Sequence, residues 1–248
     1  MKKLWNLTYL PLAVLIAGAV GTLLRLWLLT AGRDAGGLLI AGHPAQILLV
    51  ILSLGIFVLL LLSTRHLVQG DKFSFNFPSS LPRFLGALAA ALGILVTSVV
   101  QLAAKGDSLH TASALLGLAA AGALAYAGFL NLRNQQPNLL LHGLVCVYLM
   151  VLLICQYRVW CSEPQIQTYC YPLLATVCTM LACYHNAMFD GDWGSRRWFT
   201  VFHLLAGFFC CISVVGDDMP LFYLAIGIWM FTDQCNLRPM SYSPKQER

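Results

Sequence analysis

The stretch that decides the fold is residues 44–62, PAQILLVILSLGIFVLLLL, which contains no Asp, Glu, Lys or Arg. An α-helix rises about 1.5 Å per residue, so about 20 apolar residues are needed to cross the hydrocarbon core of a bilayer. The stretch has this length and this composition. It therefore predicts a transmembrane helix.

Seven other apolar runs extend the pattern along the chain. They are Thr8–Leu29, Leu81–Ala104, Leu109–Leu130, Leu139–Tyr157, Pro164–Met188, Trp198–Val215 and Met219–Gln234. Short links with turn residues, such as Gly70-Asp71 and Gly216-Asp217, separate them. The sequence thus predicts an all-α, polytopic transmembrane helical bundle of about eight spans. We expect a single transmembrane domain over residues 1–240 and a disordered cytoplasmic tail over residues 241–248.

The composition of the whole chain also indicates a membrane protein. Of its 248 residues, 59% are hydrophobic and only 10% are charged, whereas about a quarter of a typical soluble domain is charged. Surface that faces lipid needs no charge, so the lipid bilayer is the expected partner. The net charge of +5 is spread along the chain, so no nucleic acid is expected to bind.

Basic residues predict which side of the membrane each link occupies. With eight spans and a cytoplasmic N-terminus, the outside basic residues are Arg33, Lys105 and Arg158. The eleven inside are Lys2, Lys3, Arg65, Lys72, Arg83, Arg133, Arg196, Arg197, Arg238, Lys245 and Arg248. Cytoplasmic links are enriched in Lys and Arg, so both termini are expected inside (N-in/C-in). With seven spans, Arg238, Lys245 and Arg248 would lie outside. The count of basic residues would then be eight inside and six outside.

The first and last runs leave details of this topology open. The eighth run is short for a crossing, since only 14 residues separate Asp218 from Asp233. The first run could be a signal peptide, but it continues through Leu26–Leu29 with no clear cleavage site. We therefore expect an uncleaved span, in which the Arg25 side chain reaches the outer headgroups.

Stripes of small residues mark faces where helices can pack closely. Gly86 and Ala90 are four residues apart, as are Gly117, Ala121 and Ala125. Close backbone approach allows van der Waals packing to drive helix association in lipid. The stripes fit packing within the bundle, which we favour, or a face that binds a membrane protein partner.

The nine cysteines all lie between Cys146 and Cys235, and no Cys-x-x-Cys pair occurs. This spacing argues against zinc-ribbon and thioredoxin-like motifs, so the thiols are expected to be small packing groups. Cys161 and Cys170 bracket a predicted helical hairpin, and a helical path puts their Cα atoms roughly 12 Å apart. A disulfide needs less than about 7 Å, so we expect both to be reduced.

No signature of a known reaction is present. The chain has no Gly-x-Ser-x-Gly, His-Glu-x-x-His, Walker loop or dinucleotide fingerprint. No catalytic residue, metal or cofactor is therefore named, and a non-enzymatic protein is favoured over an enzyme. The pair Asp190 and Asp192 is interpreted as part of a tight turn, because the later positions of a calcium loop are not acidic.

Two polar clusters are candidate ligand sites. The outer one contains Arg158 and Glu163, which could pair across the link after the fifth run. This cluster could form the entrance of an extracellular ligand site. It could instead be a capped helical hairpin anchored by Trp160, and we favour this second interpretation.

The inner cluster lies at the predicted cytoplasmic ends of the fifth to seventh runs. It contains His142, Tyr184, His185, Asn186, Asp190 and His203. Ionisable groups at membrane depth often mark ion paths, metal sites or proton relays. They can also be structural ties between helices. If a site exists, we expect it in runs five to seven, because the polar groups of the first four runs, such as Thr97, Ser98 and Gln101, can be satisfied locally.

The last third to half of the chain resembles a known group of proteins. The matching stretches are Trp160–Gln165, Tyr184–Asp190 and Gly194–Arg197. They are similar to uncharacterised multi-span membrane proteins of anaerobic Gram-positive bacteria, a group with no assigned activity. The resemblance implies a bacterial plasma membrane and a multi-pass protein, and it implies no reaction.

Two classes of function follow from the sequence. The first is a non-enzymatic integral membrane component, namely a small transporter, a transporter subunit or a scaffold. The alternative is a membrane-embedded enzyme, or a metal or proton site, at the cytoplasmic face of spans five to seven.

Overall fold

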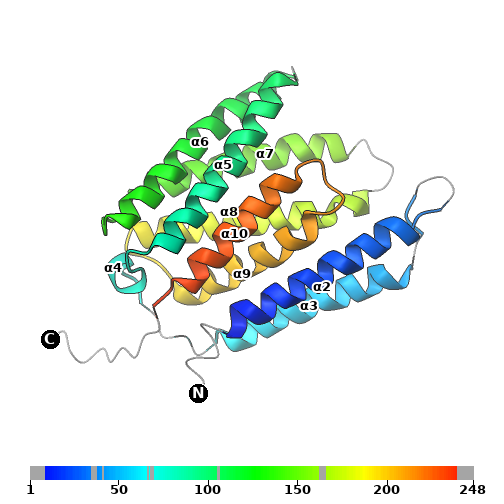
Figure 1. The fold of residues 1–248 in the computed structure, drawn as a ribbon, viewed down its shortest axis with the longest axis horizontal. Coiled ribbons are helices and arrows are strands. Elements are labelled where there is room, and N and C mark those ends of the chain that lie inside the picture. Colours follow the sequence, from blue (N-terminus) through cyan, green and yellow to red (C-terminus); the bar gives the residue numbers. More distant parts are fainter. Residues whose placement is uncertain are drawn as a thin grey trace.

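The computed structural model describes residues 9–34, 38–40, 42–65, 67, 70–104, 107–161 and 166–238. A long helix corresponds to each of the eight apolar runs, and the predicted helical bundle is confirmed (Figure 1). The long helices are α2 (Leu10–Ala31), α3 (Pro44–Ser63), α5 (Leu81–Ala103), α6 (Ser108–Leu132), α7 (Leu139–Trp160), α8 (Cys170–Asp190), α9 (Arg196–Ser213) and α10 (Pro220–Cys235). Between them lie a short helix, α4 (Phe73–Asn76), and a 3₁₀ turn, η2 (Ile166–Tyr169).

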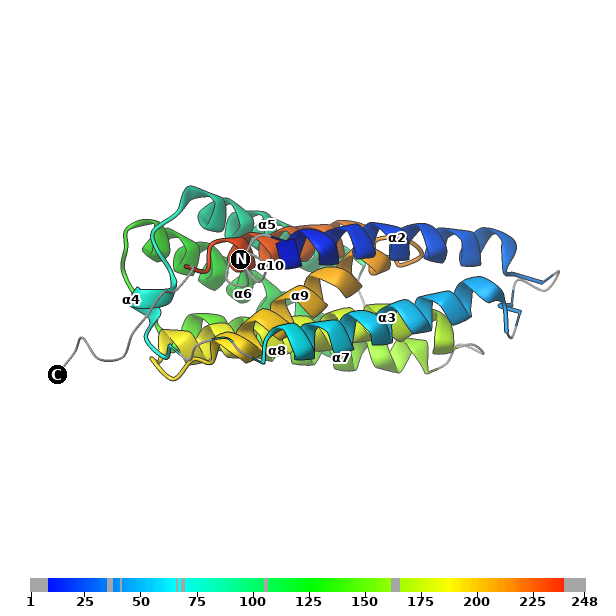
Figure 2. The same ribbon diagram turned by 90° about the horizontal axis from the view of Figure 1, so that it is seen from below.

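Consecutive long helices run in opposite directions, so α2 begins and α10 ends at the same end of the bundle (Figure 1). We call this the α4 end, because α4 lies there. The opposite end, which carries the α9–α10 link with Asp217, is called the Asp217 end. Helix α9 lies in the middle of the bundle (Figure 2) and contacts α2, α3, α8 and α10. Its central place explains why 14 of its 18 residues are buried.

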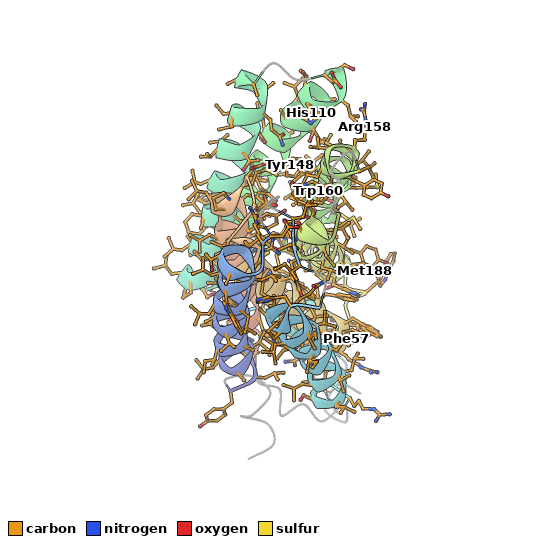
Figure 3. All side chains as sticks on the ribbon, turned by 90° about the vertical axis from the view of Figure 1, so that its right-hand side faces the viewer. Phe57, His110, Tyr148, Arg158, Trp160 and Met188 are labelled. Carbon is orange, nitrogen blue, oxygen red and sulfur yellow. The ribbon has the colours of Figure 1, made fainter. Side chains whose placement is uncertain are left out.

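Six of the eight long helices, α2, α3, α5, α6, α7 and α8, are long and apolar enough to cross a membrane. Helix α3 is the most lipid-like of them: only four of its 20 residues are buried, and Phe57, marked in Figure 3, is 42% exposed. Helices α9 and α10 have 18 and 16 residues, about 27 Å and 24 Å at 1.5 Å per residue. Both are slightly shorter than a hydrocarbon core of about 30 Å. The number of long helices therefore equals the predicted number of eight, and six of them are long and apolar enough to cross a membrane.

The small-residue stripes pack inside the bundle. A Cβ added at Gly86 would overlap the Thr232 side chain of α10. A Cβ added at Gly117 would overlap Ser98 of α5 and lie 2.7 Å from the Tyr148 ring of α7. These contacts occupy the stripes with neighbouring helices of the same chain, as favoured above.

One expectation about charge placement is wrong. Arg25 does not reach the headgroup region but is only 2% exposed. Its guanidinium donates hydrogen bonds to the carbonyl oxygens of Val215, at 2.7 Å, and Thr168, at 3.1 Å. Both carbonyls lie outside regular α-helix, so their oxygens are free to accept a hydrogen bond from a side chain. Arg25 therefore ties α2 to the Asp217 end.

All nine cysteines lie in the described residues and have free thiols. Cys161 and Cys170 are both exposed. The tight turn at Asp192 is also present, with a positive φ of 60° at this residue. The Asp192 carboxylate accepts a hydrogen bond from the backbone N–H of Phe73 at 2.9 Å, which holds α4 against the α8–α9 turn.

Candidate functional site

At the α4 end, the start of α7 lies beside the end of α8, because the two helices are antiparallel neighbours. His142 is in the first turn of α7 and Asp190 is the last residue of α8. His142 Nδ1 lies 2.5 Å from Asp190 Oδ2, and both side chains are buried. The two side chains share one hydrogen bond.

A second buried group lies next to this pair and joins four helices. Arg83 of α5 donates from Nε to Asp233 Oδ1 of α10 at 3.0 Å. Asn186 of α8 donates from Nδ2 to Asp233 Oδ2 at 3.2 Å. The same amide nitrogen lies 3.2 Å from Nε2 of His203 on α9. We call the six residues Arg83, His142, Asn186, Asp190, His203 and Asp233 the charged cluster.

The hydrogen bonds of His203 fix its protonation state. Its Nδ1 lies 2.9 Å from the Phe199 carbonyl oxygen, which only accepts, so Nδ1 carries a proton. Its Nε2 faces Nδ2 of Asn186. This amide nitrogen also donates to the Asp233 carboxylate, so it is the donor atom of the Asn186 side chain. Nε2 therefore accepts, and His203 is neutral in this arrangement. Because Nε2 is also 3.7 Å from Asp233 Oδ2, a proton on Nε2 would replace the Asn186 contact with an ion pair.

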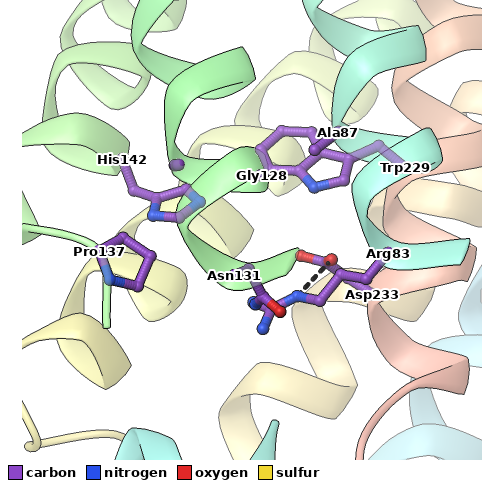
Figure 4. Close-up of a pocket in the computed structure, with 9 residues that line it drawn as sticks. Arg83, Ala87, Gly128, Asn131, Pro137, His142, Trp229 and Asp233 are labelled. Atoms are coloured by element: carbon purple, nitrogen blue, oxygen red, sulfur yellow. Dashed lines mark hydrogen bonds and ion pairs between the residues drawn. The ribbon is translucent and has the colours of Figure 1, made fainter. Parts of the chain in front are cut away.

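A small cavity lies between the two parts of the charged cluster (Figure 4). It is lined by Arg83, Asn131, His142, Trp229 and Asp233, among others, and its volume is about 10 Å³. Trp229 stacks on His142, with ring centroids 6.3 Å apart and planes 12° apart. A cavity of this size holds about one water molecule.

Three buried polar atoms of the cluster have no hydrogen-bond partner within the described chain. They are Arg83 Nη1, Asn186 Oδ1 and Asp190 Oδ1. Most buried polar atoms are paired, so such an atom indicates a bound water or a functional role. Here the three atoms offer one donor and two acceptors at the charged cluster.

Aromatic side chains close the α4 end over the charged cluster. Phe73 and Phe77 of the α4 segment pack with Phe189, Phe199 and Leu237. The Arg83 guanidinium lies 3.9 Å from the centroid of Phe77, a cation–π geometry. The Phe199 ring stacks on His203, with centroids 3.7 Å apart. The charged groups are thereby shielded from solvent at this end, where Arg83 is 4% and His203 is 0% exposed.

Four of the eight residues predicted for a site come together: His142, Asn186, Asp190 and His203. Three others, Tyr184, His185 and Arg158, do not join them. Tyr184 is 49% exposed, and His185 stacks on Phe202 with centroids 5.3 Å apart. Arg158 has an exposed side chain that lies 3.9 Å from the Asp107 carboxylate. Glu163 lies outside the described residues.

Arg83 and Asp233 form the centre of the cluster and are not among the residues predicted for a site. The sequence predicts Arg83 on the cytoplasmic side and Asp233 at the end of the last span. One feature of the sequence could have indicated their contact. Arg83 lies just inside the third apolar run and Asp233 just inside the eighth, so two opposite charges have the same predicted depth in the membrane. The cluster therefore extends beyond spans five to seven to include α5 and α10.

The geometry does not bring the histidines together around one point. In the described part of the chain, no group of three or more His, Cys, Asp and Glu residues is placed to hold a metal ion. What the cluster can do chemically is hold buried charge at Arg83 and Asp233 and accept a proton at His203. Comparisons with models of protein families, with curated proteins and with solved structures find no match to this chain.

Proposed function

We propose that the protein is a small proton-dependent transporter, a non-enzymatic multi-pass component of a bacterial plasma membrane. The observation that carries this proposal is the charged cluster, with Arg83, Asp233 and His203 buried inside a bundle of apolar helices. Ionisable groups at membrane depth are costly, and in membrane proteins they commonly mark ion pathways and proton relays. The bacterial plasma membrane is supported by the sequence resemblance alone.

The cluster offers a simple protonation step. When a proton from water binds Nε2 of His203, that nitrogen can no longer accept from Asn186. The imidazolium then pairs with Asp233, which already accepts from Arg83 and Asn186. Asp233 is the residue on α10 that binds α5, α8 and α9, so a proton on His203 changes the contacts that hold α10 in place. Such a change can couple proton binding to helix movement.

The bias of basic residues supports a cytoplasmic α4 end. Arg133, Arg196, Arg197 and Arg238 lie at this end, in or next to the helix termini. Protons would then reach the charged cluster from the cytoplasm past the α4 segment, and from outside along the interior of α5, α7 and α10. Tyr148 and Ser98, both fully buried, are the polar groups about midway along that interior.

A membrane-embedded enzyme remains the second candidate, because His142 and Asp190 form a base with an orienting carboxylate. The cavity beside them argues for the transporter. Its volume of about 10 Å³ accommodates a water or a proton carrier and no organic substrate.

Proton flux into liposomes tests the proposal. The full chain would be reconstituted with a pH-sensitive dye inside, and a valinomycin-clamped potassium gradient would set the potential. We expect faster acidification than in empty liposomes. The double variant Arg83→Gln/Asp233→Asn removes both charges while keeping hydrogen-bonding groups, so we expect it to fold and to reduce flux to the level of empty liposomes.

The matched control is Asp107→Asn, an exposed carboxylate far from the charged cluster, which should keep wild-type flux. Two results would overturn the proposal. One is a wild-type protein that conducts no protons in either orientation. The other is a folded double variant that conducts as the wild type does, because the charges would then be structural ties only.

A further inference from the structure

A continuous row of aromatic side chains runs across α8 and α9 at the α4 end. These two helices pack against each other, and the end of α8 lies beside the start of α9 (Figure 1). Tyr184 contacts His185, and His185 stacks on Phe202 with ring centroids 5.3 Å apart. Phe202 in turn stacks on Trp198, with centroids 5.9 Å apart. We call Tyr184, His185, Phe202 and Trp198 the aromatic row.

The aromatic row is open to the surroundings of the bundle. Tyr184 is 49% and Trp198 is 40% exposed, and His185 and Phe202 are partly exposed. Tyr184 lies six residues before the end of α8, which is about 9 Å along the helix at 1.5 Å per residue. The row therefore begins at a helix end and extends into the span. This depth covers the boundary between headgroups and hydrocarbon, where Tyr and Trp side chains are enriched.

A cation lies at the shallow end of the aromatic row. The Arg197 guanidinium is 5.1 Å from the centroid of the Trp198 ring, a cation–π geometry. Arg197 is the second residue of α9, so its charge lies at headgroup depth. None of the ion pairs formed within the described chain includes Arg197. The guanidinium is thus held by a ring and has no carboxylate of its own.

The charges around Arg197 favour an anionic partner. The charged side chains of the α8–α9 turn, the α4 segment and the adjoining end of the described chain are Lys72, Arg196, Arg197 and Arg238, with Asp71 and Asp192. Four cations against two carboxylates leave this surface net positive. The other two aspartates of the α4 end, Asp190 and Asp233, are buried in the charged cluster. Arg65 and Arg133 add positive charge at the same end, and Lys2, Lys3, Lys245, Glu247 and Arg248 lie outside the described residues.

From these observations we infer that the aromatic row and Arg197 bind an anionic glycerophospholipid, with its phosphate against Arg197 and an acyl chain along the rings. A guanidinium can donate two parallel hydrogen bonds to phosphate oxygens, and it can stack on an aromatic ring at the same time. An acyl chain alone would leave Arg197 without an anion, and a free phosphate would leave the rings without an apolar partner. The lipid site does not depend on proton transport.

Lipid titration of the full chain in detergent tests the inference, with bound lipids counted by native mass spectrometry. The probes are phosphatidylglycerol, phosphatidylcholine with the same acyl chains, and inorganic phosphate. Phosphatidylcholine carries a positive choline group that cancels its phosphate charge. We therefore expect phosphatidylglycerol to bind about fivefold more tightly than phosphatidylcholine. Inorganic phosphate at the same concentration should not displace it.

Variants assign the binding to the aromatic row. Arg197→Gln should weaken phosphatidylglycerol binding about fivefold, to the level of phosphatidylcholine. Trp198→Leu removes the ring that holds the guanidinium and serves as a second variant should Arg197→Gln not fold. The matched control is Arg133→Gln, which removes an exposed cation at the same end that also lies over a ring, 4.4 Å from the Phe129 centroid. The control should bind phosphatidylglycerol as the wild type does.

Four results would overturn the inference. The first is equal binding of the two lipids to the wild type, and the second is displacement of the lipid by inorganic phosphate. The third is an equal loss in Arg133→Gln and Arg197→Gln, or normal binding by the folded row variants, since the attraction would then be unspecific. The fourth is a dimer in the mass spectra that Trp198→Leu dissociates, which would assign the aromatic row to a second copy of the chain.

Discussion

The two ends of the bundle differ in how their polar residues contact one another. At the α4 end, ion pairs and hydrogen bonds of the charged cluster join α5, α7, α8, α9 and α10 beside a cavity of about 10 Å³. At the Asp217 end, the side chains of Gln101, Gln156, Asp217 and Asp218 lie around a cavity of about 140 Å³. Charged groups that contact one another tie helices together, whereas the polar groups at the Asp217 end lie beside open space. Helices α5, α6 and α7 line both cavities, so a change at one end can reach the other.

The largest effect should follow from breaking the ion pair at the α4 end. Asp233→Leu leaves Arg83 buried without its carboxylate, and removal of one partner of a buried pair costs about 3–5 kcal/mol. We expect the free energy of unfolding, measured by denaturation in detergent, to fall by this amount. The double variant Arg83→Met/Asp233→Leu should recover most of it. If Asp233→Leu is as stable as Asp107→Asn, the charged cluster does not hold the helices together.

A second effect should come from the region between the two cavities. Gly117→Ala adds a Cβ that overlaps Ser98 and the Tyr148 ring, and overpacking of this kind costs about 1–3 kcal/mol. The matched control is Gly122→Ala on the same helix, where an added Cβ meets nothing within 4 Å. Alanine is the better helix former, so the control should be neutral or more stable. Thermal unfolding of the two variants in detergent tests the comparison, and equal melting temperatures would contradict it.

The helical bundle was predictable from the sequence because each span is a local property. Residues 44–62 contain enough apolar side chains to define α3 without any contact to the rest of the chain. The polar groups of the third span were also partly predictable. Thr97 and Ser98 donate to carbonyl oxygens four residues earlier, as expected.

The candidate site was less predictable, because its contacts join distant parts of the chain. The His142–Asp190 contact was within reach, since both residues lie near the facing ends of consecutive spans. The Arg83–Asp233 contact was not, since 150 positions separate the two residues and only the packing of α5 on α10 brings them together. Gln101 shows the same limit. It was expected to be satisfied locally, yet its carbonyl oxygen has no partner within the described chain.

The pH dependence of stability should distinguish the Asp217 end from an ordinary surface. Burial raises the pKa of the Asp217 carboxyl above the usual aspartate value, about 3.9. Asp218 adds to this increase and Arg25 opposes it, while His110 and Tyr223 are the other titratable groups nearby. As the pH falls, Asp217 is therefore protonated earlier than an exposed aspartate, and the cavity loses negative charge.

Because the pKa of Asp217 is raised in the folded protein, protonation of this carboxyl favours the folded state. The free energy of unfolding should therefore rise as the pH falls from neutral toward the usual aspartate range, and the Asp217→Asn variant should lose this rise. Thermal unfolding in detergent across a pH series measures it. The same pH dependence in wild type and variant would contradict the prediction.

The smallest effect is expected at His185, and it sharpens the comparison between a residue inside the charged cluster and one outside it. His203 is fully buried with both ring nitrogens engaged, whereas His185 is partly exposed and stacks on Phe202. In His203→Gln the proton-accepting nitrogen is lost, so proton flux should fall to the level of empty liposomes. In His185→Gln only an aromatic contact is lost, worth about 0.5–1.5 kcal/mol, and flux should match the wild type. The two variants make the same chemical change on neighbouring helices, so differences in expression or lipid insertion are controlled. Equal loss of flux in both would mean that the path runs along the outer face of α8 rather than through the charged cluster.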